Sequence, residues 1–231
     1  MREIVFDTET TGLDPSDGHR VVELGCVELI DHLPSGNSFH RYLNPERLVP
    51  PETTRVHGLT DEFLADKPLF ADVVDEFLEF LGDAPLVIHN AVFDIKFINA
   101  ELARLRREPI PLARAIDTID IAKAKIPGAR YSLDDLCKRF GIDLSARSKH
   151  GALLDAELTA LLYLELIGGR QTRLELAPAG SRPADDLQSR SARQRPAPLA
   201  PRLSEAEAAA HALFIEKELG GEALWNRRRT N

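Results

Sequence analysis

The sequence predicts an α/β fold in which a mixed sheet is flanked by helices. Short apolar runs with strand character come first along the chain, and segments with helical spacing come mostly later. Hydrophobic residues make up 43% of the 231 residues, which is enough for one domain with a buried core and additional segments. Residues 1 to about 170 contain these patterns and are predicted to form that domain.

The predicted strands lie mainly in the first half of the chain, between turn residues. We expect them at residues 3–6, 21–30, 37–43, 86–88 and 115–118. The segment 21–30 is a long apolar run typical of a central strand. The sequence Pro-Ser-Gly-Asn at 34–37 predicts the turn before the next strand, and Val-Pro-Pro at 49–51 predicts a loop.

The predicted helices are identified by apolar residues that recur every three or four positions. We expect them at residues 70–81, 93–106, 119–125 and 132–140, and from just after His150 to Gly168-Gly169. Gly82 follows the first of these and is placed to end it.

The last sixty residues have a different composition. Residues 177–202 are rich in Pro, Ala, Ser and Arg, with few large apolar residues, so they predict a flexible linker. Ser204 and Glu207 then form a capping-box pattern that predicts a helix ending at Gly220-Gly221. A single short helix is marginal alone in water, so we expect it to dock on another protein or to fold back onto its own domain.

Charge and composition exclude several kinds of protein. The net charge of −8 argues against a large basic face for non-specific binding of duplex nucleic acid. No apolar run approaches the length of a membrane span, and the N-terminus enters a strand pattern without a signal-peptide layout, so we expect a cytoplasmic protein with no membrane contact. Cys26 and Cys137 lack metal-ligand spacing and are expected to be buried thiols.

Three short motifs carry four carboxylates and one histidine. Asp7 and Glu9 lie two residues apart on a predicted strand, so both side chains point to one face. Asp94 begins a helix, and His150 precedes Asp155 by five positions. Each residue alone has an ordinary explanation, such as an acidic turn, a helix cap or a surface histidine. Together, crowded carboxylates need cations, and a two-metal Mg²⁺ or Mn²⁺ site beside a histidine is suited to phosphodiester hydrolysis.

These motifs resemble the three exonuclease motifs of the DEDDh 3′→5′ exonuclease family. The histidine variant is indicated because Gly151 stands where the tyrosine variant has Tyr. The resemblance covers residues 1 to about 170 and implies a ribonuclease-H-like fold with a five-stranded mixed sheet. It also implies two Mg²⁺ or Mn²⁺ ions as cofactors and His150 as the general base. The implied metal ligands are Asp7, Glu9, Asp94 and Asp155.

The resemblance further implies a pocket for the last nucleotide of a single-stranded 3′ end. Glu9 and the Thr10 backbone N–H match the groups that bind the 3′-hydroxyl. The implied walls of the pocket are Leu13, Val56, His57 and Phe93. Val56 and Phe93 are equally well explained as core residues.

Within the family, the segment 56–64 and the tail are similar to the proofreading epsilon subunits of bacterial DNA polymerase III. This similarity implies a clamp-binding peptide and linker at 171–203 and a polymerase-binding segment at 204–231. The sliding clamp would bind Gln171, Leu174 and Leu176, and the polymerase (alpha) subunit would bind Leu213, Phe214, Leu224 and Trp225. Such a tether would keep an acidic nuclease near its DNA end.

Two alternatives remain at this point. A free-standing ribonuclease of the same family, which trims RNA ends, would share every catalytic residue but would not need the tail. A non-catalytic adaptor with this fold would be expected to lack at least one of the five site residues, and none is missing.

Overall fold

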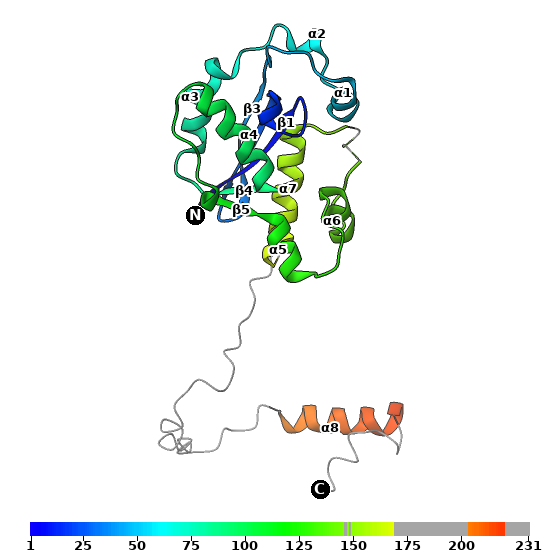
Figure 1. Ribbon diagram of the computed structural model, residues 1–231. Helices are drawn as coiled ribbons and strands as arrows, with labels where there is room; N and C mark the ends of the chain where they lie inside the picture. Colours follow the sequence, from blue (N-terminus) through cyan, green and yellow to red (C-terminus); the bar gives the residue numbers. More distant parts are fainter. Residues whose placement is uncertain (146, 148, 169–202, 220–231) are drawn as a thin grey trace. The chain divides into compact units, whose positions relative to one another are not determined.

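The computed structural model describes residues 1–145, 147, 149–168 and 203–219. Contacts between residues divide the chain into two units, Met1–Leu174 and Glu175–Asn231, and each is described by itself. The first unit contains the sheet and seven of the described helices, and the second contains α8 (Figure 1).

A five-stranded mixed sheet organises the first unit, as predicted. Its strands are β1 (Arg2–Thr10), β2 (Val21–Ile30), β3 (Leu33–Tyr42), β4 (Leu86–Ile88) and β5 (Ala115–Asp117), in the order β3-β2-β1-β4-β5. The three strands from β1 to β3 pair antiparallel, whereas β4 pairs parallel with both β1 and β5. Three strands therefore run in the same direction and end at the same edge of the sheet.

Helices cover both faces of this sheet (Figure 1). On one face, α3 (Phe70–Leu81) and α4 (Ala91–Arg104) pack in the same apolar cluster as Ile4 and Phe6 of β1. On the other face, α7 (Ala152–Ile167) packs on Val5 of β1, with α5 (Thr118–Lys125) and α6 (Leu133–Phe140) beside it. The side chains of β1 thus alternate between the two faces, as the period of two requires.

The turn between β2 and β3 corrects one prediction. It lies at Asp31 and His32, whose φ angles are 51° and 68°, and not at residues 34–37. Two successive residues with positive φ close a two-residue hairpin whose twist matches that of the strands. The side chains of Ser35 and Asn37 donate hydrogen bonds to the Glu28 carboxylate on β2, at 2.7 and 2.8 Å. These hydrogen bonds hold residues 34–37, where the turn was predicted, as part of β3.

The prediction of a loop at 49–51 is wrong for its last residue, because helix α1 (Pro51–His57) begins at Pro51. Proline suits the first turn of a helix, where its missing N–H has no partner to lose. Gly58 ends α1 with a φ of 80°, a left-handed conformation that glycine adopts without strain. The short α2 (Asp61–Leu64) follows and was not predicted.

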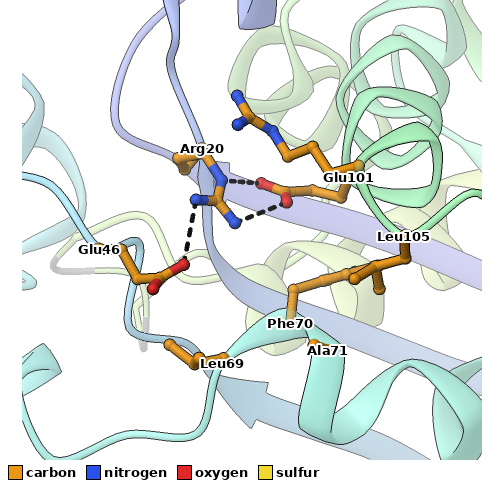
Figure 2. Close-up of a pocket in the computed structure, with 8 residues that line it drawn as sticks. Arg20, Glu46, Leu69, Phe70, Ala71, Glu101 and Leu105 are labelled. Atoms are coloured by element: carbon orange, nitrogen blue, oxygen red, sulfur yellow. Dashed lines mark hydrogen bonds and ion pairs between the residues drawn. The ribbon is translucent and has the colours of Figure 1, made fainter.

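A partly buried ion pair ties the start of β2 to α4 (Figure 2). The guanidinium of Arg20 donates from Nε and Nη2 to the two carboxylate oxygens of Glu101, at 2.7 and 2.9 Å. The backbone N–H of Val21 donates to the same carboxylate at 3.3 Å. A cavity of about 220 Å³ lies beside this pair. The pair fixes where β2 begins against α4.

In the second unit, α8 (Glu205–Phe214) continues as a π-helical segment, Ile215–Leu219. The predicted capping box is confirmed, because Ser204 Oγ accepts from the Glu207 N–H and the Glu207 side chain accepts from the Ser204 N–H. The predicted linker at 177–202 and the stop at Gly220-Gly221 lie outside the described residues. Within the described ranges, none of the helices has both the length and the apolar character that a membrane crossing needs.

Candidate active site

The carboxyl ends of the parallel strands form one side of an open cleft of about 580 Å³. Asp7 comes from the end of β1, His89 and Asn90 directly follow β4, and the first residues of α5 follow β5. Crevices at the carboxyl ends of parallel strands are common ligand sites in α/β proteins. The side chains that line this cleft are Asp7, His89, Asn90, Ile119, Tyr131, Ser132, Leu133, Asp134, Arg147, His150 and Asp155.

Asp7 and Glu9 face α7 because they share the alternation of Val5. Their partners across the strand pair are Gly25 and Glu23. Gly25 lets α7 come close to the sheet: a Cβ at this position would lie 2.2 Å from the carbonyl carbon of Ala152, at the start of α7. The close approach brings the first turn of α7 to the end of β1.

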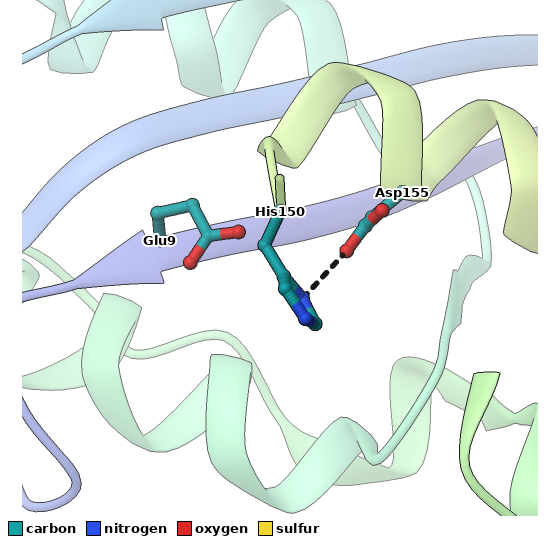
Figure 3. A group of neighbouring side chains, drawn as sticks. All are labelled: Glu9, His150 and Asp155. Carbon is teal, nitrogen blue, oxygen red and sulfur yellow. Dashed lines mark ion pairs between the residues drawn. The ribbon is translucent and has the colours of Figure 1, made fainter. Parts of the chain in front are cut away.

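That approach gathers Glu9, His150 and Asp155 into one cluster (Figure 3). One ligand atom from each lies within 4.8 Å of the others. Asp155 is buried in the first turn of α7, and His150 precedes the helix with 47% of its side chain exposed. The His150 N–H donates to the Val56 carbonyl at 3.3 Å, which ties this loop to the end of α1.

Asp94 reaches the site from α4 and is not part of that tight cluster, and neither is Asp7. The buried Asp94 carboxylate accepts two hydrogen bonds from Thr8, from the backbone N–H at 2.9 Å and from Oγ1 at 2.6 Å. Thr8 thus holds Asp94 on the face of β1 opposite to Asp7 and Glu9. The four predicted carboxylates therefore meet around the end of one strand, but from both of its faces.

Asp117 supports the cleft from outside its lining, and the sequence analysis missed it. Its carboxylate accepts from the N–H groups of Asn90 and Ala91, at 3.2 and 2.9 Å, and from that of Ile119 at 2.8 Å. One side chain therefore fixes the starts of both α4 and α5. An aspartate at the end of a predicted strand, two residues before a predicted helix, is an N-cap signal that could have identified it.

Burial and like charges make the carboxylates of this site costly to ionise. Burial raises the pKa of Asp7 well above its ordinary value, and the charges of Asp94, Glu9 and Asp155 raise it further. Burial, followed by the charge of Asp155, raises the pKa of Glu9 to about 8. The pKa of Asp94 is also raised by burial, against the opposing hydrogen bonds from Thr8. Cations would relieve this repulsion, and an oxygen-rich donor set with one imidazole fits hard divalent ions.

One cation from the chain itself lies in the cleft. Arg147 was not predicted as a site residue, and only 7% of its side chain is exposed. Its Nε and Nη2 donate to the two oxygens of Asp155, at 2.6 and 2.5 Å. Among the described residues that line the cleft, it is the one arginine or lysine. An arginine three positions before His150 gave no signal in the sequence, because its role depends on the folded geometry.

Comparison with known proteins assigns the family. The exonuclease (RNase_T) family model matches residues 4–163. The DNA polymerase III subunit epsilon of Salmonella typhimurium is 46% identical over 239 aligned residues, covering 97% of each chain. The chain belongs to the DNA polymerase III epsilon-subunit family. The expectation drawn from the motifs is thereby confirmed.

Further similarities agree with this family. The epsilon subunit of Rickettsia conorii is 54% identical over 179 residues, covering 76% of this chain and 78% of the relative. A solved structure of exonuclease X in complex with 5′-overhanging duplex DNA has a TM-score of 0.57 and 27% identity, covering 71% of this chain and 90% of the other. Like other members of the epsilon family, the chain is a 3′→5′ exonuclease. The ribonuclease alternative is not favoured by these relatives.

The residues predicted to surround the terminal nucleotide of an epsilon-family substrate lie near the end of β1 and on α1 and α4. Thr10 is buried, and its Oγ1 donates to the Gly12 carbonyl at 2.6 Å. Leu13 and Val56 are exposed, at 83% and 46%. Their roles in binding stay predictions.

His57 and Phe93 are more enclosed. His57 is buried at the end of α1, its Nδ1 accepts from the Leu59 N–H at 3.0 Å, and burial lowers its pKa. Phe93 packs against the main core cluster, with its ring 4.9 Å from that of Phe97. Packing in the core therefore accounts for at least part of the Phe93 side chain.

The residues predicted to bind other subunits are only partly described. Leu213 and Phe214 lie on α8, and each is 56% exposed. The other predicted partner-binding residues lie outside the described residues: Gln171, Leu174, Leu176, Leu224 and Trp225.

Proposed function

We propose that this chain proofreads DNA synthesis by removing mismatched 3′-terminal nucleotides as 5′-monophosphates. The observation that carries the proposal is the convergence of Glu9, Asp155 and His150 at the carboxyl end of β1. Acidic oxygens beside an imidazole in an open cleft suit metal-assisted hydrolysis of a phosphodiester. The epsilon-family relatives, which match along nearly the whole chain, indicate DNA as the substrate.

In this proposal, the metal ligands are the four carboxylates around the end of β1: Asp7, Glu9, Asp94 and Asp155. They would hold two Mg²⁺ or Mn²⁺ ions, which suit their oxygen donors. Such ions, when bound, would activate a water molecule and neutralise the charge that develops on the leaving 3′ oxygen.

The remaining steps fall to side chains and backbone groups of the chain. His150 takes the proton of the attacking water, because an imidazole accepts protons near neutral pH. Glu9 and the Thr10 N–H bind the terminal 3′-hydroxyl, so the enzyme acts at ends and not at internal bonds. The exposed side chains of Leu13 and Val56 would border the last sugar and base. A mismatched end enters more readily, since less pairing energy is lost when it frays.

We further propose that the chain works within the replicative polymerase. Its net charge of −8 gives little general attraction to DNA, so a tether would supply the necessary local concentration. The exposed apolar side chains of Leu213 and Phe214 are suited to bind the polymerase subunit. The proposed parts are a nuclease domain at 1–170, a clamp-binding peptide and linker at 171–203, and a polymerase-binding segment at 204–231.

Digestion of a primer–template with a mismatched 3′ end tests the nuclease proposal. We expect release of mononucleotides with Mg²⁺ or Mn²⁺, faster than from a matched end, and no release with a chelator. Asp7→Ala should abolish the activity. Equal or faster cleavage of short RNA of the same sequence would instead favour the RNA-trimming alternative.

Deletion of residues 204–231 tests the tether. The shortened chain should keep its activity on free oligonucleotides, because the cleft is built from residues of the first unit. It should no longer co-purify with the polymerase subunit. Retained co-purification would show that the tail is not the binding segment.

A further inference from the structure

Arg147 contacts more groups in the cleft than the one carboxylate that would balance its charge. Besides its two bonds to Asp155, its Nη2 lies 2.8 Å from Nδ1 of His150, and its Nη1 donates to Asp134. Burial lowers the pKa of Arg147, but the hydrogen bond to Asp155 and the charges of Asp155, Asp134 and Asp7 together outweigh it, so the pKa is raised and the guanidinium stays charged. One guanidinium therefore binds three groups of the site at once.

The first consequence concerns Asp155. Both of its oxygens accept short, charge-assisted hydrogen bonds from Arg147 in a parallel fork. A carboxylate held in this way has its lone pairs directed at the guanidinium. Divalent cations that bind Asp155 must therefore compete with Arg147 for the same oxygens.

The second consequence concerns His150. A guanidinium has only N–H donors, so at 2.8 Å the Nδ1 atom of His150 must be the acceptor. In the neutral ring the proton is then on Nε2, and neither nitrogen has a free lone pair. The longer 3.3 Å distance from Nδ1 to Asp155 does not change this assignment, because Arg147 is closer. In this arrangement His150 cannot accept the proton of a water molecule.

We propose that Arg147 is a positioning residue that holds the nuclease site at rest by competing with divalent metal for Asp155 and by occupying Nδ1 of His150. The inference depends on the metal-dependent function proposed above. Metal binding displaces the guanidinium from Asp155 and frees the lone pair of His150 in the same movement.

Asp134 gives the displaced guanidinium a second partner. Its side chain is 45% exposed at the rim of the cleft and already accepts from Nη1 of Arg147. Arg147 can leave Asp155 and remain paired with Asp134, so its charge is not left buried and alone. The exchange thereby avoids the cost of an unpaired buried cation.

The test measures binding of Mn²⁺ to the full chain without DNA, by calorimetry, together with the melting temperature Tm. Arg147→Met removes the competitor and keeps an apolar side chain of similar length. We expect about tenfold tighter Mn²⁺ binding, the size of a typical coupling between two ligands. Tm should fall in the metal-free variant and recover with Mn²⁺, so that Mn²⁺ raises Tm by more than in the wild type.

Arg20→Met is the matched control, because Arg20 forms the same bidentate pair with buried Glu101 outside the cleft. It should lower Tm equally with and without Mn²⁺ and leave Mn²⁺ affinity unchanged. Unchanged or weaker Mn²⁺ binding by Arg147→Met, with normal binding by the wild type, would overturn the inference. Absence of Mn²⁺ binding by the wild type would instead contradict the proposed metal-dependent function.

A measurement on the wild type covers the case in which Arg147→Met does not fold. The ring ¹⁵N signals of His150, assigned by comparison with His150→Gln, report which nitrogen carries the proton. We expect Nδ1 to be an unprotonated acceptor without metal and its signal to move when Mg²⁺ is added. A ring signal that stays unchanged at saturating Mg²⁺ would show that Arg147 does not release His150.

Discussion

Two partly buried arginine–carboxylate pairs in the first unit have the same bidentate geometry but different surroundings. Arg20 and Glu101 join β2 to α4, and a backbone N–H completes the carboxylate. Arg147 and Asp155 lie on the open cleft, where the same guanidinium also meets His150. The Glu101 carboxylate has a backbone partner as well as its arginine, whereas the Asp155 carboxylate is the one for which we propose an exchange between Arg147 and a cation.

This difference shows that geometry alone does not separate a structural ion pair from a functional one. A buried pair adds little stability over an apolar replacement, but loss of one partner is costly. The distinguishing feature is which other groups surround the carboxylate. Asp155 shares its neighbourhood with Glu9 and His150, and its charge raises the pKa of Glu9.

The largest expected effect comes from removing each carboxylate charge in turn. Asp155→Asn should lower the exonuclease rate roughly 1000-fold, because the site loses one of its proposed metal ligands. Glu101→Gln should leave the rate within a few-fold but cost about 2 kcal/mol of stability, since Arg20 loses its bidentate partner and keeps only the longer ion pair with Glu46, at 3.6 Å. Mononucleotide release and thermal unfolding measure the two effects. A large loss of rate in Glu101→Gln below its Tm would erase the distinction between the pairs.

A smaller effect should follow from shifting α7, which carries Asp155. Gly25→Ala places a Cβ 2.2 Å from the backbone of Ala152, so α7 must shift and carry Asp155 and His150 with it. We expect a loss of about 3 kcal/mol, as for overpacking of a core, and a clear drop in rate. Gly151→Ala is the control, because its Cβ would meet only Glu23, at 3.9 Å. Comparable losses of stability and rate in both variants would argue against close packing as the cause.

The smallest expected effect is a dependence of metal-free stability on pH. Folding raises the pKa of Glu9 from 4.5 to about 8, so the stability associated with its protonated form is present below pH 4.5 and lost as pH approaches 8. Asp7 and Asp94 shift in the same direction. Without metal, Tm should fall between pH 5 and pH 8. Saturating Mg²⁺ should flatten this slope, and a Tm that rises over the same range without metal would contradict the assignment.

Much of the fold could be predicted because local patterns and tertiary structure agree. The apolar run of β2 and the helical spacing of α3 gave the bounds that the structure has, Val21–Ile30 and Phe70–Leu81. The hairpin at Asp31 and His32 could not be predicted, because neither residue is glycine and both adopt positive φ. Helix α1 was missed because two prolines suggested a loop, although Pro51 and Gly58 are typical start and stop residues.

The residues of the candidate site could likewise be predicted only in part. Asp7, Glu9 and Asp155 were predicted to lie together because strand and helix periods place them on predictable faces, and His150 was added from its spacing to Asp155. The structure gathers Glu9, Asp155 and His150 into one cluster. Arg147 was missed, since its contacts depend on where the chain between α6 and α7 folds. No local period determines the position of such a side chain.

The alternation along β1 has a consequence for how this sequence can diverge. Thr8 donates a hydrogen bond to Asp94 on one side, while Glu9 lies near Asp155 and His150 on the other. Substitutions at single positions of β1 change one side at a time. Deletion of one residue between Ile4 and Thr8 would move every later side chain of β1 to the opposite face of the sheet. Apolar side chains would then leave the core, and carboxylates would leave the cleft. Over evolutionary time, the length of this segment should therefore be far more constrained than its composition.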